Sequence, residues 1–280
     1  MSLSRTVQES APVIVPSAPR LAYRTAGNPD GPTICLLHSL GTSGAIWNDT
    51  AGELAGRYSL LIPDLRGHGY SSDGEVTDVA EWADDLERVL DHAGHGPDEP
   101  VVLVGVSLGG IQAIAFAATR PARVAALVVA DSFAFLPPDV SVSRIAAQTE
   151  QVRLLPMAQV AERYVAATFA DTSTRGAGIV RREMERIHPG SYLAAVRTCF
   201  GADVRHLLGA VSAPTLVLWG DRDDKTPRAL SDEIASGIRG SELRVVADAG
   251  HLAPLDNPSA FARDVTNFLQ RNAHTRRRGI

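Results

Sequence analysis

The sequence predicts an α/β fold built on a mostly parallel, twisted sheet, and three features of its 280 residues indicate this. Short apolar runs of strand length alternate with segments in which apolar residues recur every three or four positions. The runs are apolar on both faces, as parallel strands covered by helices on either side require. One stretch of about seventy residues contains no strand-like run and has a helical pattern throughout.

Six segments are predicted to be strands: TICLLH (33–38), SLLIPD (59–64), VVLVGV (101–106), VAALVVAD (124–131), PTLVLWG (214–220) and ELRVVAD (242–248). Amphipathic helices are predicted between and after them, at Thr77–His92, Leu108–Ala118, Arg228–Ile238 and Pro258–Gln270. Thr77 or Asp78 is expected to cap the first of these helices. The alternation of strands and helices places the helices on both faces of the sheet.

The chain is predicted to divide into a core and an insertion. The core comprises residues 19–135 and 210–271, and residues 136–209 form a helical cap (lid). Its helices are expected at Val140–Arg153, Met157–Phe169, Gly178–Ile187 and Ser191–Phe200. Because the insertion follows a strand, it should lie over the carboxyl edge of the sheet, where such folds bind ligands. Residues 1–18 are predicted to be a flexible N-terminal arm, and residues 272–280 a basic flexible tail.

Composition argues against several classes of function. The formal net charge of -5 gives no basic footprint for nucleic acid. No apolar run approaches the roughly 18 residues that cross a bilayer, and the N-terminus lacks the apolar core of a signal peptide. We therefore expect a cytoplasmic monomer or homodimer without a membrane partner. Cys35 and Cys199 lie in apolar surroundings far apart, which is typical of small core residues in a reducing compartment.

The stretch VVLVGVSLGGIQAIAFAA (101–118) places a serine between a buried strand and a helix. Gly105-Val106-Ser107-Leu108-Gly109 fits G-x-S-x-G, in which a sharp turn exposes the serine hydroxyl at the helix N-terminus. The residues two positions on either side of Ser107 must lack a Cβ atom to avoid a clash. A phosphate-binding loop is the alternative, but neither G-x-x-x-x-G-K-[ST] nor G-x-G-x-x-G occurs. Ser107 is therefore predicted to be a nucleophile.

A serine hydroxyl needs a histidine to remove its proton and an acid to orient that histidine. Where G-x-S-x-G forms such a turn, the acid and then the histidine follow the serine in the chain. His251 lies in VVADAGHLAPLDNP, on a loop after the last predicted strand, and is predicted to be the base. The other histidines after Ser107 are expected to lie in the insertion or the tail, away from the site; they are His188, His206 and His274.

The acid is expected in LVLWGDRDDKTP, directly after a predicted strand. Asp223 occupies the aspartate of a G-x-x-D-x-x-x-P pattern from Gly220 to Pro227 and is the preferred candidate. Asp131, which ends the strand before the insertion, is the main alternative. Asp221 and Asp224 are expected to be solvated loop charges or a helix cap.

Taken together, five motifs resemble those of the α/β-hydrolase superfamily, in the same order and from Leu21 to Leu269. They are LLHSLG, PDLRGHGYS, GVSLGG, WGDRDDKTP and AGHLAPLDNP. The segments HSLGT, Asp223–Pro227 (DxxTP) and HPGSYLAAVRTCFGADVRHLLGAVSAPTLVLWG are most similar to those of 3-oxoadipate enol-lactonases. This resemblance implies an α/β-hydrolase fold, a triad of Ser107, Asp223 and His251, and a small anionic lactone as substrate. It implies no metal and no cofactor.

The expected reaction is ester or lactone hydrolysis through an acyl-enzyme, with the backbone N–H groups of Leu40 and Leu108 binding the oxyanion. Ser39 stands where related hydrolases commonly have glycine, and His38 is expected to be structural. One of Arg197 or Arg205 is a candidate for binding a substrate carboxylate.

Several alternatives remain open at this stage. They are a carboxylesterase or carbon–carbon bond hydrolase acting on another small metabolite, a perhydrolase or haloperoxidase-like enzyme, and a low-turnover ligand receptor on the same fold.

Overall fold

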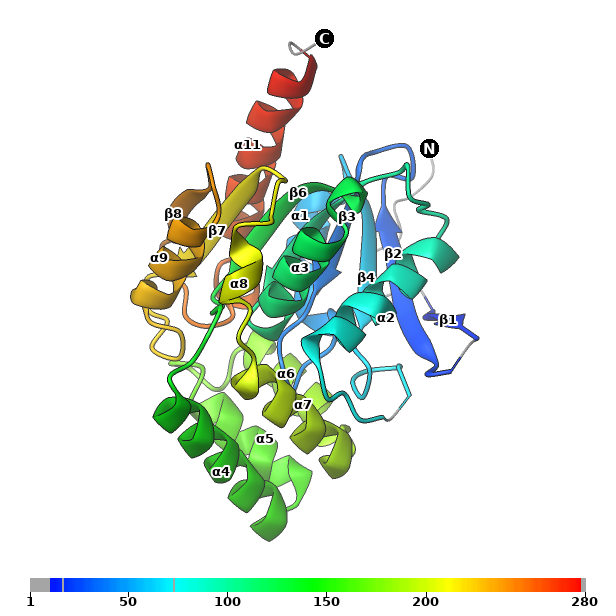
Figure 1. Cartoon of the computed structure of the whole chain (residues 1–280). Helices are drawn as coiled ribbons and strands as arrows, with labels where there is room; N and C mark the ends of the chain where they lie inside the picture. Colours follow the sequence, from blue (N-terminus) through cyan, green and yellow to red (C-terminus); the bar gives the residue numbers. More distant parts are fainter. Residues whose placement is uncertain (1–10, 17, 73, 278–280) are drawn as a thin grey trace.

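The computed structural model describes residues 11–16, 18–72 and 74–277, with side chains as far as Asn272. A single eight-stranded sheet runs through the centre of the described chain, in the order β1-β2-β4-β3-β5-β6-β7-β8 (Figure 1). The strands are β1 (Val13–Val15), β2 (Leu21–Gly27), β3 (Thr33–Leu37), β4 (Ser59–Asp64), β5 (Val101–Val106), β6 (Val124–Ala130), β7 (Thr215–Gly220) and β8 (Glu242–Val246). β2 is antiparallel to β1 and β4, and the other neighbours are parallel. The predicted mostly parallel sheet is confirmed.

All six predicted strands are present, and every residue of the central strand β5 is buried. The two additional strands, β1 and β2, form the antiparallel edge of the sheet. Their sequences lack a long apolar run, because Arg24 and Thr25 interrupt β2 and β1 has only three residues. The prediction of a flexible arm is therefore wrong for residues 13–15, since their backbone pairs with β2. Residues 1–10 and 17 of that predicted arm lie outside the described residues.

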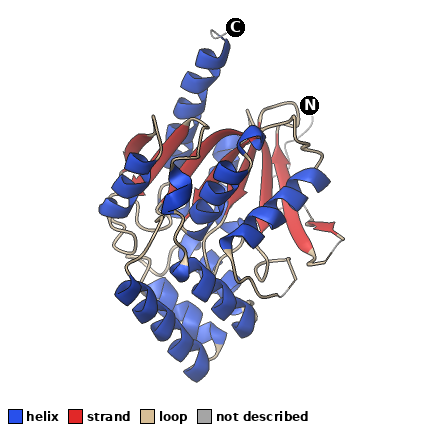
Figure 2. Cartoon of the chain, viewed as in Figure 1, coloured by secondary structure: helices blue, strands red, loops and turns tan. Residues whose placement is uncertain are grey.

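Helices cover both faces of the sheet (Figure 2). One face carries α1 (Asn48–Leu54), the short α10 (Ala253–Asp256) and α11 (Pro258–Arg277), and the other carries α2 (Val79–His92), α3 (Leu108–Thr119), α8 (Arg205–Leu208) and α9 (Arg228–Gly237). Two short 3₁₀ helices, η2 (Gly44–Trp47) and η3 (Pro121–Arg123), complete the core connections. Asp78 caps α2 by accepting a hydrogen bond from Ala80 N at 2.9 Å. Asp78 is thus the capping residue of the two candidates, Thr77 and Asp78. Each face of the sheet has its own apolar layer, and the sheet lies between the two layers.

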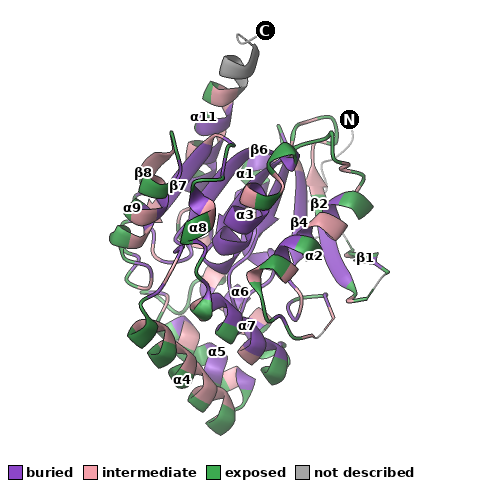
Figure 3. Cartoon of the chain, in the orientation of Figure 1, coloured by how far each residue is buried: buried purple, intermediate pink, exposed green. Residues whose placement is uncertain are grey.

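The helical insertion lies beyond the carboxyl edge of the sheet (Figure 1). It contains α4 (Pro138–Leu154), α5 (Met157–Ala166), α6 (Arg175–Glu185) and α7 (Pro189–Gly201), with α5 packed on α6 and α4 on α7. No residue of α4 is buried, and this helix forms the outer surface of the cap (Figure 3). These four helices face the carboxyl end of β6 and the loops that follow the neighbouring strands.

The two ends of the insertion meet at a narrow neck. Val204 N donates to Ala134 O at 2.8 Å, and Phe135 pairs with Asp203 as an isolated antiparallel bridge. Helix α8 lies beyond this neck and packs against the core helices α3 and α9. The cap therefore ends near residue 203, a few residues before the predicted limit of 209.

The last helix continues past its predicted end at Gln270. Its backbone is helical to Arg277, and neither glycine nor proline occurs between positions 259 and 278 to stop it. Residues 272–277 thus extend α11 and do not form a separate tail, and residues 278–280 lie outside the described part of the chain.

Candidate active site

Ser107 lies on the turn between β5 and α3, with φ of 55° and ψ of -117°. A residue with a side chain rarely adopts this backbone conformation, so the surrounding structure must hold it. A Cβ atom on Gly105 would lie 2.1 Å from Gly109 O, and one on Gly109 would lie 2.3 Å from Leu37 O. Both glycines of G-x-S-x-G are therefore required by close backbone packing, as the sequence predicts.

Ser132 stabilises the same turn, although the sequence analysis assigns it no role. Its hydroxyl donates to Ser107 O at 2.6 Å. Gly110 leaves room for this contact, because a Cβ atom there would lie 2.6 Å from Ser132 Oγ. The signal in the sequence is Gly110, the third glycine of GVSLGG, which the G-x-S-x-G pattern does not require.

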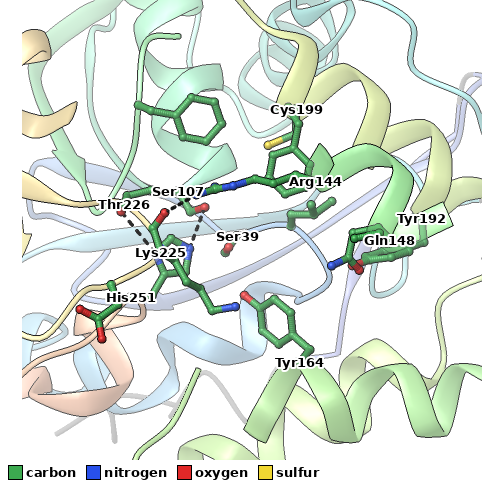
Figure 4. A pocket seen from close by; sticks show the side chains of 15 residues that line it. Ser39, Ser107, Arg144, Gln148, Tyr164, Tyr192, Cys199, Lys225, Thr226 and His251 are labelled. Carbon is green, nitrogen blue, oxygen red and sulfur yellow. Dashed lines mark hydrogen bonds between the residues drawn. The ribbon is translucent and has the colours of Figure 1, made fainter. Parts of the chain in front are cut away.

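His251 follows β8 and reaches Ser107 across the carboxyl edge of the sheet (Figure 4). Its Nε2 atom lies 3.1 Å from Ser107 Oγ, and its Nδ1 atom lies 3.1 Å from Asp223 Oδ2. An ionised carboxylate can only accept, so Nδ1 carries the hydrogen and Nε2 is free to accept the serine proton. The structure brings together the three residues that the sequence predicts as a triad.

Asp223 is held by the loop that follows β7. Its Oδ1 atom accepts hydrogen bonds from Lys225 N at 2.8 Å and Thr226 N at 3.0 Å, and Thr226 Oγ1 donates to Oδ2. Burial opposes ionisation of this carboxyl, but the hydrogen bonds from His251 and Thr226 outweigh burial and lower its pKa. Asp223 is therefore ionised where it contacts the histidine.

Asp131, the alternative acid, contacts backbone N–H groups and not the His251 ring. Its carboxylate accepts from Gly220 N at 2.8 Å and from Ala253 N at 3.3 Å, so it joins the loops that carry Asp223 and His251. Burial and the nearby charge of Asp223 raise the pKa of Asp131 well above its usual range. The structure thus gives Asp131 a positioning contact with two backbone segments, and it is Asp223 that contacts His251.

The predicted oxyanion donors flank the serine. Leu40 lies on the loop after β3, and Leu108 is the first residue of α3. The first amides of a helix have no acceptor within the helix. Within the described residues, neither the Leu40 nor the Leu108 N–H has a backbone or side-chain acceptor.

Two buried histidines hold the loop that carries Leu40. His38 Nε2 accepts from Leu65 N at 2.9 Å, while its Nδ1 lies 2.8 Å from Ser39 O. Each ring nitrogen of His38 thus has one role, Nε2 as acceptor and Nδ1 as donor, which fixes a neutral tautomer. Burial lowers the pKa of His38 to about 4, in agreement with the structural role expected from the sequence.

His68 makes the equivalent contacts from the loop after β4, and its ring centroid lies 5.3 Å from that of His38. Its Nε2 atom accepts from Gly41 N at 3.2 Å, and its Nδ1 lies 3.1 Å from Arg66 O. Burial lowers the pKa of His68 to about 3, so this ring is also neutral. His68 belongs to the motif PDLRGHGYS, but the motif alone does not reveal its contact with the oxyanion loop.

A cavity of about 310 Å³ opens between Ser107 and the cap. Ser39, Leu40, Ser107 and His251 line it from the core, and Arg144, Gln148, Tyr164 and Tyr192 line it from the cap (Figure 4). The Ser39 hydroxyl is buried there beside Tyr164, and it forms no hydrogen bond of ordinary geometry with any described residue. Cys199 is a free buried thiol, as predicted for a core cysteine, and it also reaches this cavity.

Arg144 and Lys225 are the cations in this cavity (Figure 4). The hypothesis that Arg197 or Arg205 faces the substrate is wrong. Arg205 forms an ion pair with Asp203 and stacks over Phe135. Arg197 lines a separate groove between α7 and the loop that precedes α2. Lys225 could have been found from its position two residues after Asp223, whereas no local pattern distinguishes Arg144 from the other arginines of the cap.

No group of three His, Cys, Asp or Glu side chains in the described ranges is arranged to hold a metal ion. Across the same residues, the helices are too short or too polar to traverse a lipid bilayer.

The mostly parallel sheet, the serine turn and the cap inserted after β6 define the α/β-hydrolase fold. The sequence matches the alpha/beta hydrolase family over residues 36–264, and the chain belongs to that family. It is accordingly a hydrolase of the α/β-hydrolase superfamily.

Known proteins similar to this chain include two enzymes of different substrate class. It is 26% identical to 3-oxoadipate enol-lactonase 1 of Acinetobacter baylyi, over 89% of this chain and 93% of that protein. It is 27% identical to the pimeloyl-[acyl-carrier protein] methyl ester esterase of Vibrio campbellii, over 85% of this chain and 94% of that protein. A solved hydrolase of Pseudomonas aeruginosa PA01 superposes with a TM-score of 0.84 and 27% identity, covering 93% and 99% of the two chains.

Proposed function

We propose that this protein is a serine hydrolase that cleaves an ester or lactone bond of a small anionic substrate, with 3-oxoadipate enol-lactone as the leading candidate. The observation that carries this proposal is the continuous contact from Ser107 Oγ through His251 to Asp223, at 3.1 Å in both steps. Similarity to an enol-lactonase supports the choice of lactone. The two cations in the cavity support an anionic substrate.

In the first half of the reaction, His251 Nε2 takes the proton of Ser107 as Oγ forms a bond to the carbonyl carbon. The negative charge that develops on the carbonyl oxygen is stabilised by the Leu40 and Leu108 N–H groups, and the loss of one such donor typically costs about 10²–10³-fold in rate. The carbon–oxygen bond then breaks, and the leaving oxygen receives the proton from His251. In a lactone, the acyl group and the leaving oxygen belong to the same carbon chain, so both remain attached to Ser107 in the acyl-enzyme.

In the second half, His251 removes a proton from water as the water oxygen attacks the acyl carbon. The bond to Ser107 Oγ breaks, and His251 returns the proton to the serine. Asp223 stabilises the protonated histidine in both halves. The residues named here require neither a metal nor an organic cofactor.

A spectroscopic assay with 3-oxoadipate enol-lactone tests this proposal, with 4-nitrophenyl butyrate as a generic ester and Ser107→Ala as the control. We expect lactone turnover by the wild type and the loss of both activities in the variant. Ester turnover without lactone turnover would reject the lactone and leave an esterase, the second candidate, which the similarity to a methyl ester esterase favours. Undiminished activity in Ser107→Ala would reject the mechanism. The cytoplasmic location and the monomeric or homodimeric state remain predictions from the sequence.

A further inference from the structure

The cavity beside Ser107 contains two cationic side chains that come from different parts of the chain. Arg144 lies on α4 of the cap, and Lys225 lies on the loop that also holds Asp223 (Figure 4). Within the described part of the chain, neither side chain forms an ion pair with a carboxylate. Asp223 is already bound to His251, and Asp224, the neighbour of Lys225 in the chain, lines the cavity but is exposed. Two cations therefore face one lining carboxylate, which leaves an excess of positive charge next to the nucleophile.

Both cations are held in place by contacts that leave their charge available. Arg144 Nη2 donates to Lys225 O at 2.8 Å, and its guanidinium carbon lies 5.6 Å from the centroid of the Phe200 ring. Lys225 Nζ lies 4.5 Å from the centroid of the Tyr164 ring. A carbonyl group and two aromatic rings orient these side chains but neutralise neither of them.

Partial burial makes this arrangement costly in the absence of an anion, because a desolvated cation without a counter-charge is unfavourable. The pKa of Lys225 reflects this cost. Burial and the charge of Arg144 lower the pKa of Lys225 to about 8, although the charge of Asp223 opposes the shift. An anion placed between the two side chains would remove the repulsion and provide charge-assisted hydrogen bonds.

The opposite side of the cavity offers neutral hydrogen-bonding groups. Tyr192 Oη donates to Gln148 Oε1 at 2.9 Å, which leaves the Gln148 amide nitrogen as a donor (Figure 4). The cavity thus has a charged end and a neutral end, with Ser107 accessible to both.

We propose that Arg144 and Lys225 together bind one carboxylate of the substrate and thereby select substrates that carry a carboxylate besides the scissile ester or lactone. This inference rests on the proposed function for the position of the scissile bond at Ser107. The binding of the carboxylate itself does not depend on turnover.

The composition of the chain provides a direct binding test, because Lys225 is its only lysine. Apart from the α-amino group, an amine-specific reagent such as trinitrobenzenesulfonate has one target, which peptide mass spectrometry identifies. With Ser107→Ala protein we expect glutarate to slow the modification of Lys225 at least fivefold, whereas glutaramide has no effect. Equal rates with and without glutarate would overturn the proposal, as would stronger protection by inorganic phosphate than by glutarate.

Kinetics with the active enzyme test selection. The measured quantity is the ratio of kcat/KM for 4-nitrophenyl hydrogen glutarate to kcat/KM for 4-nitrophenyl valerate, its neutral counterpart. Lys225→Met should lower this ratio about 10- to 100-fold, the usual effect of losing a hydrogen bond to a charged group, and Lys225→Arg should retain it within about threefold. Arg144→Gln should lower the ratio similarly, whereas Arg153→Gln, an exposed residue of α4 paired with Glu150, should not.

An unchanged ratio in both Lys225→Met and Arg144→Gln would overturn the proposal while leaving ester hydrolysis intact. Conversely, an enzyme that hydrolyses neither ester but shows glutarate protection would reject the proposed function and retain the carboxylate site.

Discussion

His251 Nδ1 lies 3.1 Å from Asp223 Oδ2, whereas the carboxylate of Asp131 accepts from the backbone of Gly220 and Ala253. The two buried aspartates at neighbouring strand ends therefore have different tasks. Asp223 orients the histidine, and Asp131 ties together the loops on which the acid and the histidine are carried.

Replacing each aspartate by asparagine should separate these tasks. Asp223→Asn removes the acceptor that fixes the histidine tautomer, so kcat for ester hydrolysis should fall by about 10³–10⁴-fold. Asp131→Asn retains only one of the two acceptor oxygens, so it should lower the free energy of unfolding by about 1–3 kcal/mol and leave most of kcat. Steady-state kinetics and thermal unfolding on both variants decide the point. A larger loss of kcat in Asp131→Asn than in Asp223→Asn would show that Asp131, and not Asp223, is the catalytic acid.

The glycines around Ser107 allow a matched pair of substitutions. Gly105→Ala places a Cβ atom 2.1 Å from a carbonyl oxygen of α3, so the turn cannot form and the protein should unfold at least 10 °C lower or fail to accumulate. Gly178→Ala is the control, because no atom outside the local backbone of the cap helix α6 lies within 4 Å of its Cβ position. The control should gain about 0.5–1 kcal/mol of stability from better helix propensity. Similar melting temperatures for the two variants would contradict the packing described here.

The neutral histidine pair predicts how stability depends on pH. His38 and His68 have folded-state pKa values lowered to about 4 and about 3, whereas an unfolded histidine titrates near 6.5. Between these values the unfolded chain binds more protons, so this part of the stability is fully present above about pH 6.5 and is lost as pH falls toward the folded values. Each histidine should contribute a slope of about 1.4 kcal/mol per pH unit in that window.

The variant His68→Gln tests this contribution, because a glutamine amide can accept from Gly41 N and donate to Arg66 O without titrating. Urea unfolding between pH 4 and 7 should give a shallower pH dependence for the variant than for the wild type. Parallel curves would show that His68 is not the buried neutral base inferred from its contacts.

Ser39 carries a buried hydroxyl that faces the catalytic cavity beside Tyr164 and forms no hydrogen bond of ordinary geometry with the described residues. A buried polar group left unsatisfied destabilises a protein by about 1–3 kcal/mol, so Ser39→Ala should raise the melting temperature. The same change should raise KM for a substrate that hydrogen-bonds to this hydroxyl. A variant that is less stable than the wild type would mean that the hydroxyl has a structural partner, and the difference between Ser39 and the common glycine would then concern loop conformation.

The residues that could be predicted from the sequence are those whose chemistry imposes a local pattern. Ser107 was identifiable because its strained turn requires Gly105 and Gly109, and His251 and Asp223 because they follow strands in a fixed order. The strand β2 was missed since an edge strand needs no continuous apolar run, and Arg24 interrupts it. Arg144 was missed for a different reason. Whether a cap arginine faces solvent or the cavity depends on how α4 packs on α7, which no short stretch of sequence encodes.

The central claim is that Ser107 forms a covalent acyl-enzyme, and covalent labelling tests it most directly. One fluorophosphonate molecule should bind covalently to each wild-type chain, which intact-protein mass spectrometry detects. Peptide mapping should place the adduct on Ser107. Ser107→Ala and wild-type protein unfolded before addition should remain unlabelled. An adduct on any other residue, or a native protein that hydrolyses esters yet resists the probe, would contradict the account.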